Sequence, residues 1–429
     1  MKRNNKTVMV IGEGLSSLML SKLLLDKGYM VNFFRLEPDV ERLPGISVCN
    51  AAPGIGTHNY YIESPADEKF LHHFFKLNLT KRKQNNYLYI NAKRLAYPLK
   101  ISGIIKAESF CFFLKATISY LKAVLRPRKI NSYRSLVENS FGECLYEYYF
   151  KNYLSHEYVS VDPDTIDPEL ARRRIKYVSL KYIIANLFKK NIKSCYNTET
   201  YFFPENGVVS YINVLQKELV ENPALVCYQP HSFSISCSNQ KYVITYASGS
   251  SQKKLVVDHI FANTGVNELM QALGNKTEIF EKWNPVYIMS FLIDEKNFRK
   301  DENIYCADRN VFFYQVSVNR DIKSGLTVVT GFAGGQEHKT MPGNAKSLAI
   351  ESIINLGIIS SEMSVLGFSH NILIHGKPLL LRGKYSLLKE ARTILQSQYG
   401  INLFGERPYF REISFSEDVK QLNSFNQQF

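Results

Sequence analysis

The chain has 429 residues, of which 45% are hydrophobic and 13% aromatic, and this length can bury a large core divided into two or three units. The composition excludes a disordered protein, and no apolar stretch approaches the roughly 20 residues that a membrane-spanning helix needs. The formal charge of +14 predicts an acidic partner, which could be an anionic cofactor, a phosphorylated substrate, a membrane surface or a nucleic acid.

Cysteine usage and the start of the chain bear on the compartment. The seven cysteines are an odd number without a Cys-x-x-Cys pair, which indicates free thiols in a reducing environment. The basic first residues precede an apolar run that glycines interrupt too soon for a signal peptide. We therefore expect a cytoplasmic protein. The adjacent His72 and His73 would point apart on a helix, and we predict no metal site.

The segment from Lys6 to Pro38 organises the chain. An apolar run from Val8 to Ile11 leads into glycines, a stretch of apolar residues at helical spacing ends at Lys27-Gly28, and a second apolar run covers Met30 to Phe34. A last-turn cation followed by glycine is typical of a helix end. The pattern predicts a strand, a tight turn, a helix and a second strand.

The glycines of the predicted turn have a specific physical use. Gly12 permits the sharp exit from the strand, and Gly14 lets a diphosphate approach the helix N-terminus, where free N–H groups and the helix dipole favour an anion. Ser17 holds the third glycine position and is small enough for close packing. We predict a dinucleotide phosphate site at Gly12, Gly14, Leu15 and Ser17. A doubly wound fold that keeps the turn without the ligand is the alternative.

The residue after the second strand does not decide which nucleotide is bound. An acidic side chain about twenty residues after the glycines normally binds the ribose hydroxyls, and this chain has Arg35 there. An arginine suits a ribose phosphate better than free hydroxyls. An NADP-type ligand is therefore a physical alternative to one with an unmodified ribose.

Several later segments resemble, in order and spacing, the flavoproteins of the amine oxidase, protoporphyrinogen oxidase and UDP-galactopyranose mutase superfamily. The glycines, aromatic residues and histidine near 54–61 resemble the family segment that lies against the flavin ring. Residues 87–101 resemble a hairpin of the family and keep its Tyr97 and Pro98. Of all segments, residues 135–180 match the family pattern best. Residues 201–219 resemble the return to the cofactor domain, and 401–422 the C-terminal flavin motif. One departure is Leu43 to Ile46, where the family usually has Gly-Gly-Arg.

The resemblance implies an α/β fold: a discontinuous Rossmann-like FAD/NAD(P)-binding domain with an inserted α+β substrate domain. The cofactor domain would comprise 1–62, 205–265 and 370–429, and the substrate domain 63–204 and 266–369. Residues 256–263 are expected to form one strand, and 286–332 an antiparallel sheet. Gly56, Gly405 and Glu406 would contact FAD together with the glycine turn and Arg35, and the catalytic candidates are His58, Tyr61 and Tyr97.

The implied activity is FAD-dependent oxidation, or flavin-assisted isomerisation, of a small anionic or sugar-nucleotide-like substrate. Arg382 and Lys384 are candidates to hold that anion, although such a pair is often only a solvated face. A non-catalytic nucleotide-binding or regulatory module and an NADP-linked reductase stay open. The basic, apolar stretch from Arg172 to Lys193 is compatible with peripheral membrane contact or with a core-facing helix. No nucleic-acid recognition module is present.

Overall fold

A computed structural model supplies the coordinates, and the structure describes part of the chain. The described residues are 6–12, 14–35, 64–76, 79–97, 108–175, 200–204, 208–238, 240–248, 251–275, 282–294, 301–308, 310–320, 326–335, 342–360, 365–405, 407–409 and 415–428. Among them, no helix is both long enough and apolar enough to cross a membrane.

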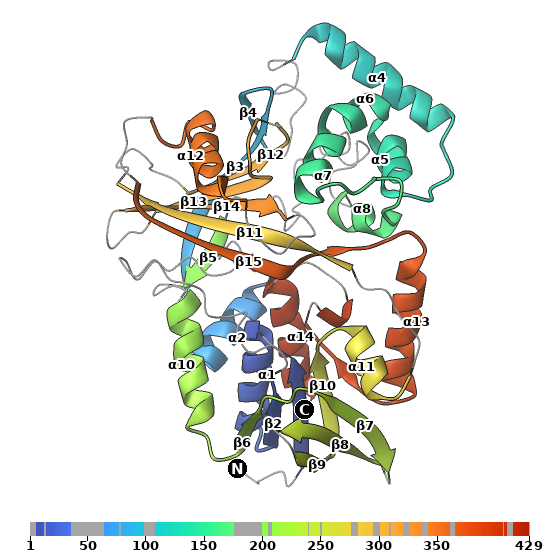
Figure 1. The fold of residues 1–429 in the computed structure, drawn as a ribbon, viewed down its shortest axis with the longest axis vertical. Coiled ribbons are helices and arrows are strands. Elements are labelled where there is room, and N and C mark those ends of the chain that lie inside the picture. Colours follow the sequence, from blue (N-terminus) through green and yellow to red (C-terminus); the bar gives the residue numbers. More distant parts are fainter. Residues whose placement is uncertain are drawn as a thin grey trace.

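A five-stranded sheet forms the lower part of the molecule in Figure 1, and all its strand pairs are parallel. The predicted first strand, helix and second strand are present within one residue of their expected ends, so this prediction is confirmed. The strands, in spatial order, are β16 (Asn402–Leu403), β10 (His259–Asn263), β1 (Thr7–Gly12), β2 (Met30–Phe34) and β6 (Leu225–Tyr228).

The two faces of this sheet bury different partners, because successive side chains of a strand point to opposite sides. Val8 and Val10 of β1 join a core with one group of helices, whereas Met9 and Ile11 join a core with a small sheet and a second group. The first group is α1 (Gly14–Asp26), α2 (Pro65–Phe75), α10 (Val208–Val220) and α14 (Phe415–Gln428). The second is β7 (Phe233–Ser238), β8 (Lys241–Ser248), β9 (Ser251–Val257), α11 (Val266–Ala272) and α13 (Lys384–Ser397).

A larger sheet crosses the middle of the molecule, and α12 (Ala345–Asn355) lies on it (Figure 1). The strands within 286–334 pair with one another antiparallel, which confirms the prediction for that stretch, whereas β12 pairs in parallel with β3. The strands, in spatial order, are β15 (Val365–Leu379), β11 (Lys282–Ile293), β14 (Thr327–Gly334), β13 (Gln315–Arg320), β12 (Asp301–Cys306), β3 (Leu79–Ile90) and β4 (Lys93–Ala96), with β5 (Thr200–Pro204) paired to β3.

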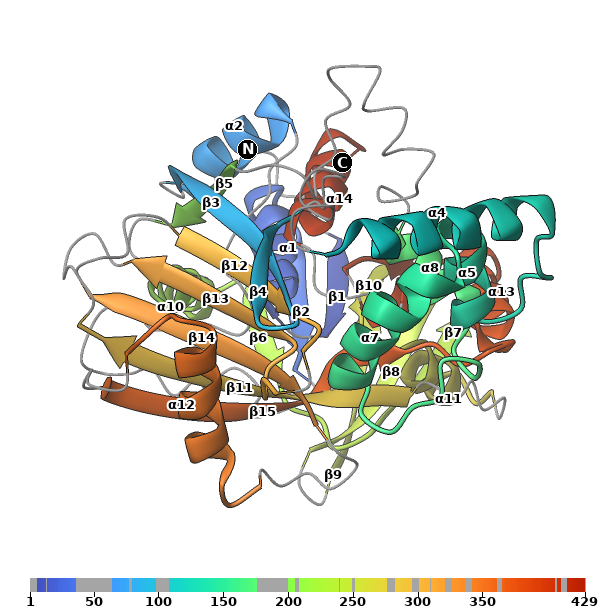
Figure 2. The same ribbon diagram turned by 90° about the horizontal axis from the view of Figure 1, so that it is seen from above.

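A group of helices packs beside the large sheet, on the right in Figures 1 and 2. Tyr146, Leu154 and Tyr158 of this group belong to the same buried cluster as Met9 and Ile11 of β1. The helical group and the parallel sheet therefore share a core. Its elements are α4 (Phe110–Leu125), α5 (Tyr133–Phe141), α6 (Glu143–Leu145), the π-helical turn η1 (Tyr146–Phe150), α7 (Lys151–Glu157) and α8 (Pro168–Ile175).

The prediction of a single strand over 256–263 was wrong. The chain breaks at Asp258, where the carboxylate accepts a hydrogen bond from Thr7 N–H at 2.8 Å and the Asp258 N–H donates to Thr7 at 2.7 Å. β9 therefore ends the small antiparallel sheet, and β10 begins a strand of the parallel one.

The predicted domain limits stay a prediction, but the packing of two elements bears on them. Helix α2, which was assigned to the substrate domain, packs in the core of the parallel sheet, and its Asp67 accepts a hydrogen bond from Asn423 of α14 at 3.0 Å. Strand β15 begins within the large sheet and ends near α13, so it connects the two parts.

Candidate functional site

The turn between β1 and α1 lies at the carboxyl end of the parallel sheet, next to the end of β10. Gly12 has a φ of 136° and Gly14 one of 84°, values that glycine adopts without strain. A Cβ on residue 12 would lie 2.8 Å from the carbonyl carbon of Asn263. The turn can therefore pass so close to β10 only because residue 12 has no side chain.

Gly405 reaches the same point from the other end of the chain. It follows β16 with a φ of 72°, and a Cβ there would lie 2.7 Å from Nδ2 of Asn263. That amide donates to the hydroxyl of Ser17 at 3.4 Å. Asn263 is thus enclosed between the glycine turn, the first turn of α1 and the C-terminal loop. The predicted cofactor residues Gly12, Ser17 and Gly405 are brought together.

Helix α14 holds this arrangement in place. The hydroxyl of Ser16 donates to the carboxylate of Asp418, and the N–H of Gly405 donates to the side-chain carbonyl of Gln421 at 2.9 Å. Ser16 and Asp418 are both buried. The beginning of α1 and the loop after β16 are therefore fixed by one helix, although the three segments lie about 400 positions apart at the extremes. Two polar residues that sequence reasoning missed, Asn263 and Asp418, carry these contacts.

Arg35 lies where the sequence placed it, directly after β2. Its N–H donates to the carbonyl of Tyr228, at the end of the neighbouring strand β6, at 2.9 Å. Burial raises the pKa of the Cys227 thiol, and the positive charge of Arg35 opposes that shift. The arginine therefore stands at the carboxyl end of the sheet, among β2 and β6, with its charge close to Cys227.

The residues available for a dinucleotide fit a diphosphate at this edge. α1 runs for 13 residues, its first turn contains no acidic residue among those described, and the glycine with a φ of 84° begins it. Such a helix start presents free N–H groups to an anion. Gly56, His58, Tyr61 and Glu406 lie outside the described residues, and their predicted roles stay predictions.

A second concentration of polar chemistry lies between the large sheet and the helical group. We call it the tyrosine cluster, and its members are all partly exposed except the buried Tyr314. Adjacent ring centroids are separated by 5.2 to 6.4 Å, the range of favourable aromatic pairs. The cluster consists of Tyr97, Tyr149, Tyr153, Tyr305 and Tyr314.

Two phenols of the tyrosine cluster, those of Tyr97 and Tyr149, are desolvated, and one of them stands on a π-helical turn. Burial raises the pKa of Tyr97, and burial together with neighbouring charges raises that of Tyr149. Tyr149 stands on the π-helical turn η1, a geometry often found at functional sites. The phenols of Tyr97 and Tyr149 are therefore neutral donors at physiological pH, a chemistry suited to hydrogen-bonding polar groups of a ligand.

A buried ion pair underlies this cluster. Nζ of Lys377 lies 3.1 Å from the carboxylate of Glu157, and it lies 5.5 Å from the ring centroid of Tyr314. The side chain of Glu157 is 1% exposed, and that of Lys377 is 16% exposed. The pair joins α7 to β15, so it connects the helical group to the large sheet.

The sequence named Tyr97 of this cluster as a catalytic candidate, and the structure places its ring 5.2 Å from that of Tyr305. Sequence reasoning named none of the other members as a site candidate, although it noted the aromatic helix that contains Tyr149. In a chain with 27 tyrosines, no local pattern distinguishes Tyr153, Tyr305 and Tyr314. The aromatic run from Tyr146 to Phe150 was the one usable signal.

Arg382 lies between β15 and α13, and Lys384 is the first residue of α13. This connection lies next to the helical group. The N–H of Arg382 donates to the carbonyl of Thr165 at 2.9 Å, and the N–H of Gly383 donates to the carboxylate of Asp167 at 3.2 Å. The Arg382 side chain is exposed. These hydrogen bonds attach the connection to the segment directly before α8, and a substrate-binding role for the two cations stays a prediction.

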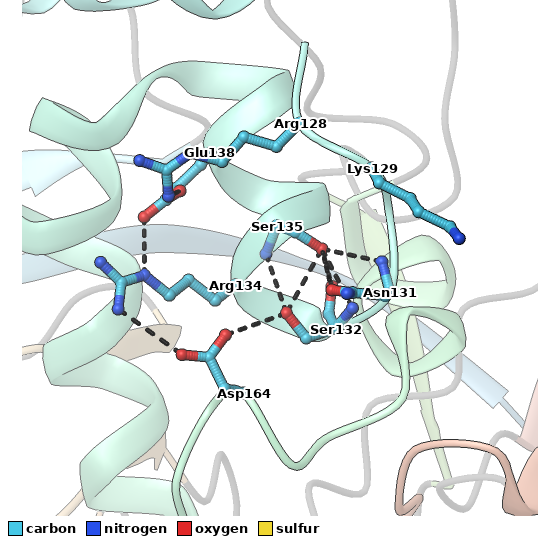
Figure 3. A pocket seen from close by; sticks show the side chains of 8 residues that line it. All are labelled: Arg128, Lys129, Asn131, Ser132, Arg134, Ser135, Glu138 and Asp164. Atoms are coloured by element: carbon cyan, nitrogen blue, oxygen red, sulfur yellow. Dashed lines mark hydrogen bonds and ion pairs between the residues drawn. The ribbon is translucent and has the colours of Figure 1, made fainter.

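A polar cavity of about 400 Å³ lies within the helical group (Figure 3). Its arginines are paired internally: Arg128 contacts Glu138, while Arg134 lies 2.7 Å from Glu138 and 3.5 Å from Asp164. Ser132 caps α5 and contacts Asp164 at 3.1 Å. Because these groups satisfy one another, we assign the cavity a structural role in joining α5 to the loop before α8.

Comparison with solved structures identifies the fold. The chain is similar to a reduced UDP-galactopyranose mutase, with 14% identity, 99% of this chain and 93% of the other covered, and a TM-score of 0.74. It is also similar to a protein from Exiguobacterium described as a protoporphyrinogen oxidase, with 13% identity, 99% of this chain and 98% of the other covered, and a TM-score of 0.68. A third similar structure is cyclohexylamine oxidase from Brevibacterium oxydans, with 12% identity, 99% of each chain covered and a TM-score of 0.66.

No known family profile and no curated protein matches the chain. The similarity at this level of identity concerns the fold, which extends over nearly the whole length of each protein. The predicted fold class is therefore confirmed, and the predicted resemblance to this group of proteins is confirmed at the level of the fold. The chain is an α/β protein with the fold of these solved structures.

Proposed function

We propose that this protein binds FAD along the carboxyl edge of the parallel sheet and is a flavin-dependent oxidoreductase or mutase. The observation that carries the proposal is the convergence of Gly12, Ser17 and Gly405 on Asn263, at the edge where an α/β sheet binds its ligands. The similarity of the whole chain to oxidases and a mutase supports the same class.

In this proposal the chain's own residues hold each part of the dinucleotide. The N–H groups at the start of α1 receive the diphosphate, with Gly14 leaving room for it. Arg35 faces the ribose end, after β2, and Gly405 closes the opposite side. FAD, when bound, supplies the redox or nucleophilic chemistry of its ring system, and the protein orients it and excludes water.

The substrate is proposed to be a small anionic or sugar-nucleotide-like molecule that contacts the tyrosine cluster. Neutral phenols such as Tyr97 and Tyr149 donate hydrogen bonds to hydroxyl or phosphate oxygens. A net positive chain attracts such an anion. The notion of an anionic substrate rests on this charge and on the resemblance, and the cluster provides polar contacts for it.

The visible absorption spectrum of the purified protein tests the cofactor. We expect flavin bands, or their appearance together with quenched flavin fluorescence when FAD is added to colourless protein. The matched variant is Gly14→Asp, which places a carboxylate at the start of α1 and should abolish the uptake of FAD. A colourless protein that takes up no FAD would contradict the proposal and favour a non-catalytic module of the same fold.

An NADP-linked reductase stays a second candidate because Arg35 occupies the ribose-binding position. The same titration distinguishes the two, using FAD in one series and NADPH in the other. Tight NADPH binding that Arg35→Glu abolishes, without any uptake of FAD, would support this candidate in place of the first.

A further inference from the structure

Helix α4 exposes an apolar stripe on its outer side. Among the described residues, the three most exposed large hydrophobic side chains are Leu125 at 79%, Val220 at 74% and Phe110 at 68%. Leu125 and Phe110 both lie on α4. Among the described residues, no other helix leaves more than two large apolar side chains exposed, whereas α4 leaves six. The stripe comprises Phe110, Leu114, Ile118, Leu121, Val124 and Leu125.

The spacing of these residues places them on one side of α4. Phe110, Leu114, Ile118, Leu121 and Leu125 recur every three or four positions, which is the repeat of one helix face. The opposite side packs on the protein: Ala116 is buried, Ser119 accepts a hydrogen bond from Cys144 N–H at 3.0 Å, and Phe112 stacks on Tyr148 at 4.6 Å. A helix that is apolar all round normally has protein or lipid on every side.

α4 lies at the edge of the molecule. Figure 1 shows it along the top, above α5 and α6, and Figure 2 shows it crossing the outside of the helical group. Its N-cap, Ser109, accepts a hydrogen bond from Phe112 N–H at 3.2 Å, so the helix begins at a defined residue. The stripe therefore belongs to a well-formed helix and stands away from the cofactor edge.

The charges along α4 and the segment that follows it have one sign. From Phe110 to Val137 the sequence contains six basic residues and no acidic one. Within the described part of the chain, Lys115, Lys122, Arg126 and Lys129 make no ion pair, and all four are exposed. Long basic side chains next to an apolar helix face can reach anionic headgroups while the apolar residues enter the acyl region.

We propose that α4 docks on an anionic lipid surface, with its stripe inserted and Lys115, Lys122, Arg126 and Lys129 at the headgroups. A second copy of the chain fits this face less well. Two α4 helices packed face to face would bring like charges together, and a strip about 24 Å long and about 10 Å wide offers about 240 Å². A stable dimer needs about 800 Å² from each partner.

Flotation of the full-length protein with vesicles tests the proposal. We expect binding to phosphatidylcholine vesicles that contain phosphatidylglycerol, weaker binding to pure phosphatidylcholine, and loss of binding at high salt. Ile118→Glu and Leu121→Glu should each lower the partition coefficient about tenfold or more, because an inserted aliphatic side chain contributes more than the ~1.4 kcal/mol that corresponds to tenfold. Lys122→Gln should lower it about fivefold on the anionic vesicles.

The matched control is Val214→Glu on α10, which puts the same charge at an exposed apolar residue, 56% accessible, on another helix. It should leave vesicle binding unchanged. Leu121→Trp gives a second readout, since its emission should shift to the blue when anionic vesicles are added; the chain has one tryptophan of its own. These tests need no flavin, so their failure is separate from failure of the proposed cofactor.

Two results would overturn the proposal. One is an absence of binding to anionic vesicles by the folded protein. The other is a concentration-dependent dimer, measured by light scattering, that Ile118→Glu makes monomeric while vesicle binding is unaffected. The second result would assign the α4 face to self-association.

Discussion

Gly12 lies against the main chain of Asn263, so closely that a Cβ on residue 12 would stand 2.8 Å from the Asn263 carbonyl carbon and 3.1 Å from its Cα. The two residues end neighbouring parallel strands, at the register pair Gly12↔Asn263. Main-chain atoms cannot rotate away as a side chain can. The glycine is thus required by the protein's own packing as well as by any diphosphate at the helix start.

We expect Gly12→Ala to lower the free energy of unfolding by about 2 to 4 kcal/mol, through backbone strain at a φ of 136° and overpacking against Asn263. Chemical denaturation measures the change. Gly274→Ala is the matched control, because Gly274 has a φ of 77° and nothing lies within 4 Å of a Cβ there. This variant should lose only about 1 kcal/mol of unfolding free energy, because it introduces backbone strain without a steric contact. Equal losses in the two variants would show that contact with Asn263 is unimportant.

The Glu157–Lys377 pair yields a second prediction. Lys377→Met leaves a carboxylate that is 1% exposed without its 3.1 Å partner, and we expect a loss of about 3 to 5 kcal/mol in unfolding free energy. Glu157→Gln added to Lys377→Met should recover part of that loss, since no buried charge is then left. A double variant as unstable as the sum of the single ones would indicate that the two side chains do not interact.

Local regularity explains why the first strand, helix and strand could be predicted from sequence. Their apolar residues follow the periods of strand and helix, and Gly28, with a φ of 82°, ends the helix as expected. The strand over 256–263 was predicted wrongly, because its apolar residues continue through Asp258. Only the hydrogen bonds between Asp258 and Thr7, 251 positions away, reveal the break.

The parts of the candidate site that have a local sequence pattern could be predicted, and the parts that depend on long-range contacts could not. The glycine turn and the C-terminal glycine each have a local signature, whereas Asn263, which lies between them, and Asp418 depend on long-range contacts. The tyrosine cluster is assembled from η1, α7, β12 and the residues directly after β4 and before β13, so no short segment contains it. The apolar character of α4 is visible in the sequence, but which side lacks a protein partner is not.

The pH dependence of stability provides a third prediction. Burial and the charge of Lys6 lower the pKa of His259 below 6.5, against the opposing effect of Asp258. A histidine whose pKa is lower in the folded state contributes stability that is complete above the unfolded value and lost as the pH falls through the folded value. Hydrogen bonding to Thr7 lowers the pKa of Asp258 below 3.8, so this neighbour keeps its charge over that range.

We therefore expect the unfolding free energy to fall as the pH is lowered from 6.5, and His259→Gln to flatten part of that slope. Denaturant titrations at several pH values, with wild type and variant in parallel, measure the difference. An unchanged slope in the variant would contradict the assigned shift at His259.

Arg35 provides the sharpest test of the proposed cofactor site. In dinucleotide-binding βαβ units an acidic residue at the end of the second strand binds the ribose hydroxyls, and this chain has Arg35 there, next to β6. Arg35→Glu restores the acid. We expect FAD to bind at least about tenfold more tightly, since a hydrogen bond to a charged group contributes about 1.5 to 3 kcal/mol. Quenching of flavin fluorescence during titration measures the affinity.

The control for this change is Lys217→Glu, the same reversal of charge at an exposed residue of α10. It should leave FAD affinity unaltered, which separates a local contact from a general change in net charge. If both variants alter the affinity equally, or if Arg35→Glu has no effect while FAD still binds, then Arg35 does not face the ribose. The diphosphate would in that case be held by the glycine turn alone, and the adenosine end would follow another path across the sheet.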